Sequence, residues 1–406
     1  MIGRTNALSA AGIELSLVVS VTTGSVVTAT KGSLSVSGTA SGGSVTLKLP
    51  EAGTWTVKAT YNGQTSDTKT VSVVDSYAVV LTFFSATINV TVPSGATVYL
   101  KKDGTTLQTK TSTGTVAFTV TETGTYTVEA TNGSQTTSGT VSVTSATSYA
   151  LTLSFVSSTL NSNEWDVISS VSNAGEGANY WSVGDRKAVV LNGTVGNLSL
   201  SSVTTYAFII GFNHNSSVEG SGRIHFQLGK TALSGGADVA LCDSKYEYTG
   251  RDAAFRMNTT DTNSGGWNNS YMRNTICPAF KNVLPTALKN AIKSVTKYTN
   301  NTSNSSAASA VTATTDEIFL LSEYEVFGYC TYADTNVASK QKQYDYYSAG
   351  NSEIKYNHSA TSTAVLWWLR SPYARNSNRF VVVYIEGFAD YSVAHRSNGF
   401  APGFCV

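Results

Sequence analysis

The first 155 residues of the chain consist mainly of short stretches in which apolar and polar residues alternate. From Leu15 to Phe155 the sequence is built largely of Thr, Val and Ser, interrupted by Gly. Residues 54–60 (TWTVKAT) and 86–92 (ATINVTV) are two of the clearest alternating segments. Because successive side chains of a strand point to opposite faces, the pattern predicts strands with one buried and one solvated face. This part of the chain is therefore expected to be all-β.

The strand-rich part contains an internal repeat with an offset of about seventy residues. Residues 53–60 (GTWTVKAT) return as 124–131 (GTYTVEAT), and residues 76–83 (SYAVVLTF) return as 148–155 (SYALTLSF). A unit of that length holds about seven short strands, which suits an immunoglobulin-like sandwich. The two copies resemble the bacterial Ig-like and carbohydrate-module-like sandwiches of surface and tail proteins. The predicted ranges are an N-terminal segment at 1–12, sandwich 1 at 13–84 and sandwich 2 at 85–156.

The two sandwiches carry no recognisable chemistry of their own. They contain no histidine, no cluster of carboxylates and no Gly-rich phosphate loop. We interpret them as spacers or attachment modules that contact other tail or surface proteins. Weak carbohydrate binding through Tyr61 and Tyr99 is the alternative.

The charge of the chain is low and balanced. Lys and Arg number 27 against 26 Asp and Glu, and charged residues are 13% of the total. Nucleic-acid binding and polybasic membrane attachment both need a basic surface, so neither is expected. No run approaches the roughly 20 apolar residues of a membrane span, and no secretory signal is evident at Met1, so we expect no membrane insertion.

The four cysteines predict neither a metal site nor a disulfide scaffold. Cys242, Cys277, Cys330 and Cys405 form no Cys-x-x-Cys pair, and no His lies at zinc-ligand spacing from them. We expect buried, reduced thiols, with one disulfide as the alternative, and no cofactor.

The composition changes near Trp165, where the sequence becomes mixed α and β and gains all of the histidines. A continuous apolar run predicts a buried strand, and spacings of three and four predict an amphipathic helix. A Ser-x-x-Glu capping box predicts a further helix start. The expected elements are a strand at 206–212, a helix at 268–276 stopped by Pro278, a helix of about 13 residues from Pro285 to Tyr298, an exposed loop at 299–314, a strand at 318–321 and a short helix from Ser322 to Gly328.

The last forty or so residues combine a stiff apolar frame with a chemically diverse interior. We assign the frame to Trp367, Trp368, Arg370, Pro402 and Phe404. Residues 380–385 predict a strand, and Glu386-Gly387 a tight turn with the chain returning from Phe388. Tyr, Arg, His and Asn on such a scaffold make efficient contacts, although Tyr384, Phe388 and Phe400 are equally compatible with a partly buried role. The predicted ligand-binding residues are Tyr373, Arg375, Asn376, Asn378, Arg379, Tyr384, Phe388, Asp390, Tyr391, Ser392, His395, Arg396 and Asn398.

No motif for catalysis is present. The four histidines show no metal spacing, and the sequence lacks a nucleophile elbow, a P-loop and a His-Glu-x-x-His motif. Glu323 and Glu325 lie within the capping box that starts at Ser322, where helix-end electrostatics explains them better than acid–base chemistry. We therefore expect no catalytic residues and no enzyme.

Several motifs in residues 160–406 resemble the variable proteins of diversity-generating retroelements. They are Trp181-Ser182-Val183-Gly184-Asp185, Gly265-Gly266-Trp267 with Ser270 and Met272-Arg273, Leu320-Leu321-Ser322-Glu323 with Glu325-Val326-Phe327-Gly328, Trp367 to Pro372, and Ala401 to Cys405. The resemblance implies a C-type-lectin-like fold of the formylglycine-generating type, with a variable region at 373–400. The overall fold class expected is thus two all-β Ig-like sandwiches followed by an α+β C-type-lectin-like domain.

The resemblance also implies a pattern of variation that the sequence itself allows us to examine. In that family, errors at template adenines scatter Asn codons to many residue types but never to Lys, Glu, Gln, Met or Trp. Between Tyr373 and Phe400 only Glu386 belongs to the excluded set, whereas residues 345–372 contain Glu353, Lys355, Trp367 and Trp368. The sequence has none of the Glu-Pro-Asn, Gln-Pro-Asp or Trp-Asn-Asp motifs of calcium-dependent lectins, so a calcium site is not expected.

The function implied is binding of a bacterial surface protein or glycan by a phage or prophage tail protein, often a homotrimer. The expected location is the virion tail or the bacterial cell surface. A host cell-surface adhesin with the same variable domain is the first alternative. A glycan- or cell-wall-active enzyme is the second.

Overall fold

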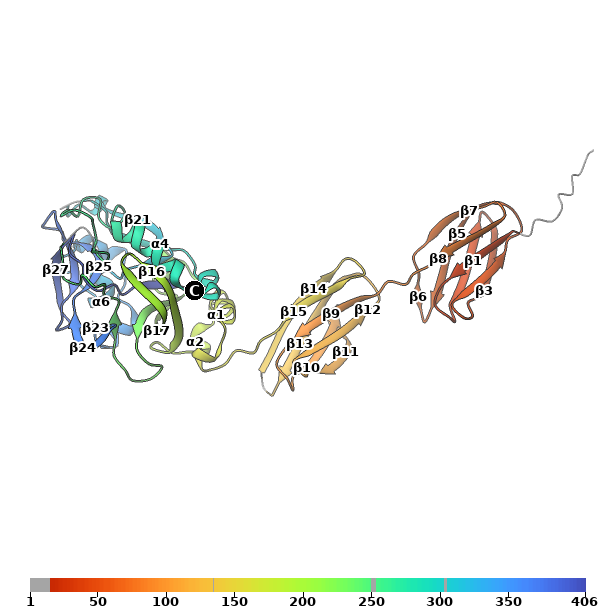
Figure 1. Cartoon of the computed structure of the whole chain (residues 1–406), viewed down its shortest axis with the longest axis horizontal. Helices are drawn as coiled ribbons and strands as arrows, with labels where there is room; N and C mark the ends of the chain where they lie inside the picture. The colour runs from red at the N-terminus through yellow and green to blue at the C-terminus, as the bar shows by residue number, and fades with distance from the viewer. Residues whose placement is uncertain (1–14, 134, 250–252, 303–304) are drawn as a thin grey trace, which may run out of the picture. The chain divides into compact units, whose positions relative to one another are not determined.

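The computed structural model describes residues 15–133, 135–249, 253–302 and 305–406. The chain is a β-rich multidomain protein with two compact units, Met1–Phe155 (unit 1) and Val156–Val406 (unit 2). The predicted N-terminal segment 1–12 lies outside the described residues. Figure 1 shows the secondary structure along the chain.

Unit 1 contains two separate hydrophobic cores, and the first lies within residues 15–83. One sheet has the order β4-β1-β8, and the other has the order β3-β2-β5-β6 with β7 also paired to β5. Trp55, fully buried on β5, packs in this core with Leu17 and Val19 of β1. The strands are β1 Ser16–Ser20, β2 Val26–Lys31, β3 Leu34–Thr39, β4 Ser44–Lys48, β5 Gly53–Tyr61, β6 Gln64–Thr65, β7 Lys69–Val73 and β8 Ser76–Val80.

The second core of unit 1 repeats this plan, as the repeated sequence requires. Its sheets are β12-β9-β15 and β11-β10-β13-β14. Tyr126 on β13 takes the place of Trp55, and β9 pairs in parallel with β15 as β1 does with β8. The strands are β9 Ala86–Thr91, β10 Thr97–Lys102, β11 Thr105–Thr111, β12 Thr115–Val120, β13 Gly124–Asn132, β14 Gln135–Val143 and β15 Ser148–Thr152.

Unit 2 is organised around a five-stranded antiparallel sheet with the order β16-β17-β18-β28-β22. The last strand of the chain, β28, therefore lies between β18 and β22, which both come earlier in the sequence. The buried run 206–212 forms the end of β17, as predicted. The strands are β16 Arg186–Val195, β17 Leu198–Phe212, β18 Ile224–Lys230, β22 Ile318–Phe319 and β28 Gly403–Cys405.

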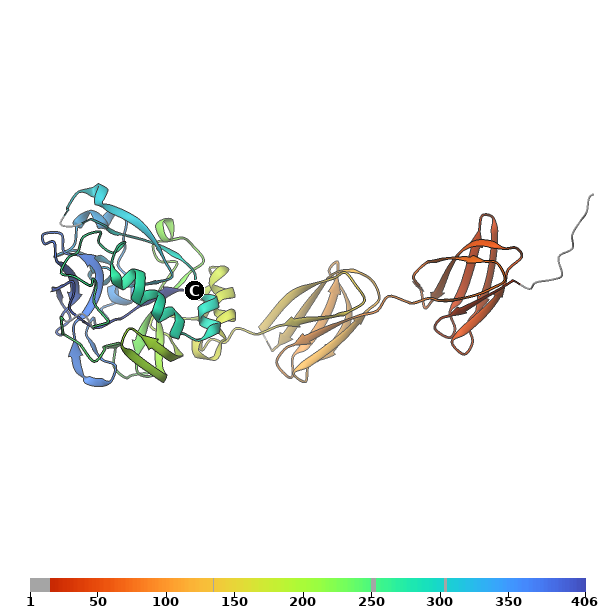
Figure 2. The same ribbon diagram turned by 45° about the horizontal axis from the view of Figure 1, so that its top comes forward.

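Three smaller sheets and several short helices complete unit 2, which Figure 2 shows turned by 45° from the view of Figure 1. The smaller sheets are β19 Val239–Ala240 with β23 Lys355–Asn357 and β24 Ala360–Val365, β20 Val295–Asn300 with β21 Val311–Asp316, and β25 Trp367–Pro372 with β26 Arg379–Val383 and β27 Ala389–Val393. The α-helices are α1 Trp165–Asn173, α2 Gly177–Tyr180, α3 Ser216–Glu219, α4 Cys277–Val283, α5 Thr286–Ala291, α6 Glu323–Phe327 and α7 Asp345–Ser348. A π-helical turn covers Met272–Ile276, and 3₁₀ turns cover Leu160–Ser162, Ala308–Ala310 and Thr335–Ser339. Within the described ranges, none of these helices has the length and apolar character needed to cross a membrane.

Three predictions for the middle of unit 2 were wrong. Pro278 does not end a helix, because the π-helical turn Met272–Ile276 continues directly into α4 and Pro278 lies in the first turn of α4. The helix predicted from Pro285 to Tyr298 ends at Ala291, because Ile292 is extended and the β-branched run from Val295 forms β20. The predicted loop 299–314 instead includes the end of β20 and most of β21, and Thr299 and Asn300 are buried.

Candidate functional site

The C-terminal segment forms a three-stranded antiparallel sheet with the order β25-β26-β27. Val381 lies opposite Tyr391, and Val383 opposite Ala389. Glu386 and Gly387 lie in the turn, where Gly387 has a φ of +90° that favours glycine. The predicted strand, turn and returning strand are therefore present.

The five predicted frame residues are all buried, so they form a rigid base for this sheet. Trp367 and Trp368 are fully buried on β25, and their indole N–H groups donate to the backbone oxygens of Glu353 and Phe255, both at 2.9 Å. Phe404 stacks on Phe226 at a centroid distance of 5.4 Å. Pro402 and Arg370 are buried as well.

Arg370 fixes β25 to helix α6 through an ion pair inside the protein. Its guanidinium contacts both carboxylate oxygens of Glu325, one of them at 2.8 Å. Lys297 donates to the same carboxylate at 3.1 Å. Burial raises the pKa of Glu325, but Arg370 and Lys297 outweigh it and hold that pKa well below its ordinary value. The glutamate interpreted from sequence as a helix-end charge is therefore also the centre of a buried charge network.

Glu325 also completes the predicted capping box of α6. The hydroxyl of Ser322 accepts from the backbone N–H of Glu325 at 3.1 Å, and the Glu325 carboxylate accepts from the backbone N–H of Ser322 at 2.9 Å. Gly328 ends the helix in the left-handed conformation. The short helix predicted from Ser322 to Gly328 is confirmed.

Glu323, the other glutamate of α6, binds the loop at residues 331–333, whereas Glu325 binds strand β25 through Arg370. Its fully buried carboxylate accepts backbone N–H groups from Thr331 at 2.8 Å, Tyr332 at 3.2 Å and Ala333 at 2.7 Å. The backbone oxygen of Tyr332 in turn accepts the N–H of Ala374, 2.9 Å away. A helix outside the C-terminal segment thus positions Tyr332 against that segment.

Tyr332, Tyr373 and Tyr391 form an aromatic cluster on the surface of the C-terminal sheet. Tyr373 and Tyr391 are stacked with centroids 5.0 Å apart, and Tyr332 meets both edge-on at 5.3 and 5.1 Å. The guanidinium of Arg379 lies 4.4 Å from the centroid of the Tyr391 ring. All four side chains are partly exposed, so the cluster offers ring edges, hydroxyls and a cation to a ligand.

A second aromatic pair lies at the turn between β26 and β27. Tyr384 stacks on Phe388 with centroids 5.0 Å apart, and Phe388 is 49% exposed. Asp390 follows on β27 and is partly exposed. The sequence was equally compatible with a contact role and a partly buried role for three aromatic residues. Phe400 is fully buried, Tyr384 is half-buried and Phe388 is exposed.

Polar groups continue the surface on the other side of the cluster. Asp261 contacts His395 at 3.1 Å and accepts from the side-chain amide of Asn378 at 2.7 Å. Arg396 lies 3.7 Å from Glu247. Arg375 is exposed, and Asn376 is partly exposed.

Two predicted contact residues are not available to a ligand. Asn398 is fully buried, and its backbone N–H donates to the backbone oxygen of Phe255 at 3.0 Å. Ser392 is also buried, because it lies on β27 opposite Phe380 of the core. The other eleven predicted residues are partly or fully exposed.

Three further residues reach this surface or support it, and sequence reasoning missed them. Tyr332 and Asp261 contribute side chains, and Glu323 holds the loop that carries Tyr332. Tyr332 and Asp261 are isolated residues in irregular segments. No periodicity in the sequence connects them to β27, so only the fold identifies them.

A buried polar cluster lies behind the frame. Lys297 donates to Glu219 and to Tyr344, both at 2.7 Å, and His225 approaches the Tyr344 hydroxyl at 3.0 Å. Burial lowers the pKa of His214 to about 3 and raises that of Glu219 to about 7, the latter against the pull of Lys297. Burial therefore keeps His214 uncharged and Glu219 partly protonated at neutral pH.

The same cluster has the donor types of a metal site but not the charge balance. His214, Glu219 and Glu325 bring ligand atoms within 4.8 Å of one another. Both carboxylates, however, already accept from the Lys297 ammonium, and Glu325 also pairs with Arg370. A divalent cation would have to displace these cations, so we assign the cluster a structural role.

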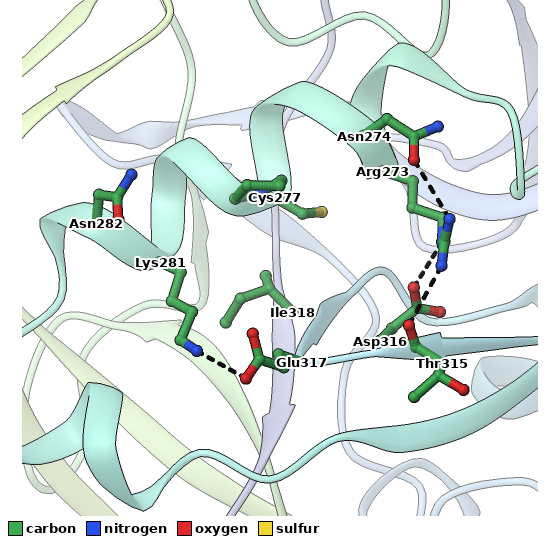
Figure 3. Close-up of a pocket in the computed structure, with 10 residues that line it drawn as sticks. Arg273, Asn274, Cys277, Lys281, Asn282, Thr315, Asp316, Glu317 and Ile318 are labelled. Atoms are coloured by element: carbon green, nitrogen blue, oxygen red, sulfur yellow. Dashed lines mark hydrogen bonds and ion pairs between the residues drawn. The ribbon is translucent and has the colours of Figure 1, made fainter.

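A pocket of about 380 Å³ lies elsewhere, between α4 and strands β21 and β22. Two ion pairs border it, Arg273 to Asp316 at 2.6 Å and Lys281 to Glu317 at 2.7 Å (Figure 3). The charged groups of the pocket thus satisfy one another. Cys277, which also lines it, is a free thiol whose pKa burial raises well above the ordinary value. The other three cysteines are free as well.

Residues 243–406, less than half of the chain, match the family model described as a domain of unknown function (DUF6273). No curated protein matches the chain.

The similar solved structures are distant. The minor pilin GBS52 of Streptococcus agalactiae is 9% identical with a TM-score of 0.24, over 35% of this chain and 95% of that one. The TIE protein of Bacillus anthracis is 11% identical with a TM-score of 0.18, and the match covers 54% of this chain but only 45% of that one. A fimbrial protein of Bacteroides ovatus is 8% identical with a TM-score of 0.22, over 97% and 99% of the two chains. At these TM-scores the similarities carry no argument about fold or function.

Proposed function

We propose that unit 2 is a ligand-binding domain of the kind found in the variable proteins of diversity-generating retroelements, with a C-type-lectin-like fold. The ligand surface comprises the eleven exposed or partly exposed residues named above together with Tyr332. The two sandwiches of unit 1 act as spacers or attachment modules. The protein is thus an adhesin of a phage tail or of a bacterial surface.

The observation that carries this proposal is the separation of frame from surface within one short segment. Trp367, Trp368 and Arg370 on β25 are completely buried, whereas Arg375, Tyr391 and Phe388 project from the loop and strands that follow. Side chains on such a base are free to change without loss of the fold. A surface required to vary needs this arrangement, whereas a fixed catalytic site does not.

The ligand is a protein or a glycan on a bacterial surface. The exposed groups include tyrosines, arginines, amides and a carboxylate, which together provide large contact area and adaptable hydrogen bonding. Homotrimer formation remains part of the proposal through the family resemblance.

Binding of the fluorescently labelled full chain to a panel of bacterial cells tests the proposal. Tyr391→Ala and Arg375→Ala should each reduce binding to a responsive strain by about tenfold or more, as expected for central contact residues. Tyr77→Ala is the matched control, because Tyr77 is 44% exposed on β8 of unit 1. Equal loss in the control and in the two surface variants would contradict the assignment of the surface.

The coding DNA supplies a second test. We expect a near-copy of the segment that encodes residues 366–406, differing at adenines and lying beside a reverse-transcriptase gene. If close relatives instead keep Tyr391, His395 and Arg396 unchanged and no such copy exists, diversification by a retroelement is excluded.

A further inference from the structure

We infer that the outer edge of β27 is a docking site for an extended segment of a protein ligand, which adds a strand to the sheet β25-β26-β27. This inference rests on the proposed function for its location. It adds a class of partner, because backbone pairing selects a polypeptide and not a glycan.

The hydrogen-bond pattern of the hairpin shows which groups of β27 point outward. Tyr384 donates its N–H to Phe388, and Ala394 donates to Asn378, both at 2.8 Å. Both pairs belong to the continuous register in which Val382 lies opposite Asp390. In an antiparallel pair, hydrogen-bonded positions alternate with positions whose N–H and C=O point away. The N–H groups of the odd-numbered positions, Ala389, Tyr391 and Val393, therefore point away from β26.

This outer edge is open in the part of the chain that the structure describes. β27 is the last strand of its sheet, and none of these three N–H groups has a backbone partner there. The carbonyl of Val393 is used locally, since it accepts the N–H of Arg396 at 3.0 Å. Three donors and the carbonyls of Ala389 and Tyr391 remain for an incoming strand.

β27 also lacks the features with which proteins usually protect an edge strand. Proline, lysine and β-bulges are the common devices. The sequence of β27, Ala-Asp-Tyr-Ser-Val, has neither proline nor lysine, and its pairing with β26 runs over all five residues without a register shift. By contrast, β24 and β16, which end other sheets of unit 2, pair through shifted registers. β21 shares these properties, because it contains neither proline nor lysine and pairs with β20 without a shift. What distinguishes β27 is its position beside the exposed residues of the proposed ligand surface.

The side chains around the edge suit a polypeptide better than a sugar. A sugar ring stacks on a free aromatic face, but the ring of Tyr391 is already in contact with Tyr373, Tyr332 and Arg379. What remains are hydroxyls and ring edges beside the backbone groups of β27, which would flank the side chains of a paired strand. An edge of this kind also offers a hydrogen-bonding pattern that stays the same while the neighbouring side chains vary.

Replacement of an outward N–H by proline tests the inference directly. Proline is tolerated on an edge strand where the N–H faces solvent, and Ser392 before Val393 is already in a strand conformation. Val393→Pro therefore removes one outward donor, and Val393→Thr is the matched control that keeps it. Ala389→Pro with Ala389→Ser provides a second pair if the first proline variant does not fold.

The probe is a displayed library of random linear peptides long enough to cover the five residues of β27, selected on the full chain. We expect selected peptides to bind the proline variant at least about tenfold more weakly than the threonine variant. Amide exchange in the complex should slow at Ala389, Tyr391 and Val393, but not at the alternate positions because these already bond to β26.

Three results would overturn strand pairing: no selected peptide, equal binding to both Val393 variants, or a dimer of the chain that Val393→Pro dissolves. The last would assign the edge to a second copy. The proposed function fails separately. If cells bind through Tyr391 and Arg375 but no peptide is selected, the ligand surface stands and the edge site falls. If peptides bind through the edge but no cell binds, the edge site stands and the proposed ligand surface fails.

Discussion

Arg370 on β25 and Glu325 on α6 form a two-point ion pair in which both side chains are fully buried. Without Arg370, Lys297 alone of these two cations would face the buried carboxylates of Glu325 and Glu219. Breaking a buried ion pair in this way typically costs about 3–5 kcal/mol. We expect Arg370→Met to destabilise the protein by that amount. Arg370→Lys should rescue it only in part, because an ammonium lacks the planar fork that matches a carboxylate.

Urea unfolding followed by tryptophan fluorescence measures this effect, since five of the six tryptophans lie in unit 2. The control is Lys281→Met, which removes a partly exposed ion pair with Glu317 and should cost less than about 1 kcal/mol. Equal losses for Arg370→Met and Lys281→Met would show that the buried pair does not hold the frame.

The features of unit 2 that follow from local sequence were predictable. The capping box at Ser322, the buried end of β17 and the turn at Gly387 depend on neighbouring residues alone. A helix was predicted beyond Ala291 because Leu288, Ile292 and Val295 have helical spacing. The prediction was wrong because tertiary pairing with β21 favours a strand from Val295.

The candidate site could be predicted only where it is continuous in the sequence. The frame and most of the displayed residues lie in one segment of about forty residues, and composition alone separates them. The burial of Asn398 and Ser392, and the approach of Tyr332 and Asp261 from distant segments, depend on how that segment packs. The pairing of Glu325 with Arg370 could not be predicted either, because 45 residues separate them in the sequence.

Glu323 is predicted to control the order of the loop that carries Tyr332. In Glu323→Gln an amide N–H₂ replaces one acceptor of the backbone N–H groups of residues 331–333, so a buried donor faces another donor. We expect a loss of about 1–3 kcal/mol and faster amide exchange at residues 331–333, measured by mass spectrometry. Glu386→Gln, at an exposed turn residue, should change neither quantity. Unchanged exchange at residues 331–333 would mean that other contacts hold the loop.

Trp368 and Tyr391 should separate stability from binding. Trp368 is fully buried with its indole N–H satisfied, so Trp368→Ala should cost about 3–5 kcal/mol. Tyr391 is partly exposed, so Tyr391→Ala should lose about 1 kcal/mol, mainly from stacking on Tyr373. Urea unfolding of both variants is the measurement. A loss for Tyr391→Ala as large as that for Trp368→Ala would place the tyrosine cluster in the core.

The thiols should be inert in the folded protein. Burial raises the pKa of Cys242 and of Cys405 to about 12, so the reactive thiolate is scarce at neutral pH. Cys330 is only half-buried, yet burial raises its pKa to about 12 too. We expect slow reaction of native protein with an aromatic disulfide reagent and release of four thiols after denaturation. Fast reaction of one thiol in the native state would locate an opening at that cysteine.

The buried cluster predicts how stability depends on pH between the ordinary pKa values of glutamate, 4.5, and histidine, 6.5. In this window the unfolded chain gains a proton at His214 and at His225, because burial keeps both neutral in the folded state. His358, whose pKa burial also lowers, acts in the same direction. The folded state instead gains a proton at Glu219, whose pKa is raised to about 7. Within the cluster, the unfolded chain binds more protons than the folded one, so the contribution of the cluster to stability should rise with pH. Burial also raises the pKa of Glu323 and of Glu353, and these two groups act in the opposite direction.

Glu219→Gln and His214→Gln should change this dependence in opposite directions. The first removes the proton that the folded state binds, so the slope of the unfolding free energy against pH should become more positive by up to about 1.4 kcal/mol per pH unit. The second removes a proton that the unfolded state binds, so this slope should become less positive by a similar amount. Urea unfolding between pH 4.5 and 6.5 measures both slopes, and residues 1–155 contain no histidine to confuse them. If Glu219→Gln left the slope unchanged or made it less positive, Glu219 would already be ionised in the folded state. Lys297 and Arg370 would then balance two full negative charges, those of Glu219 and Glu325.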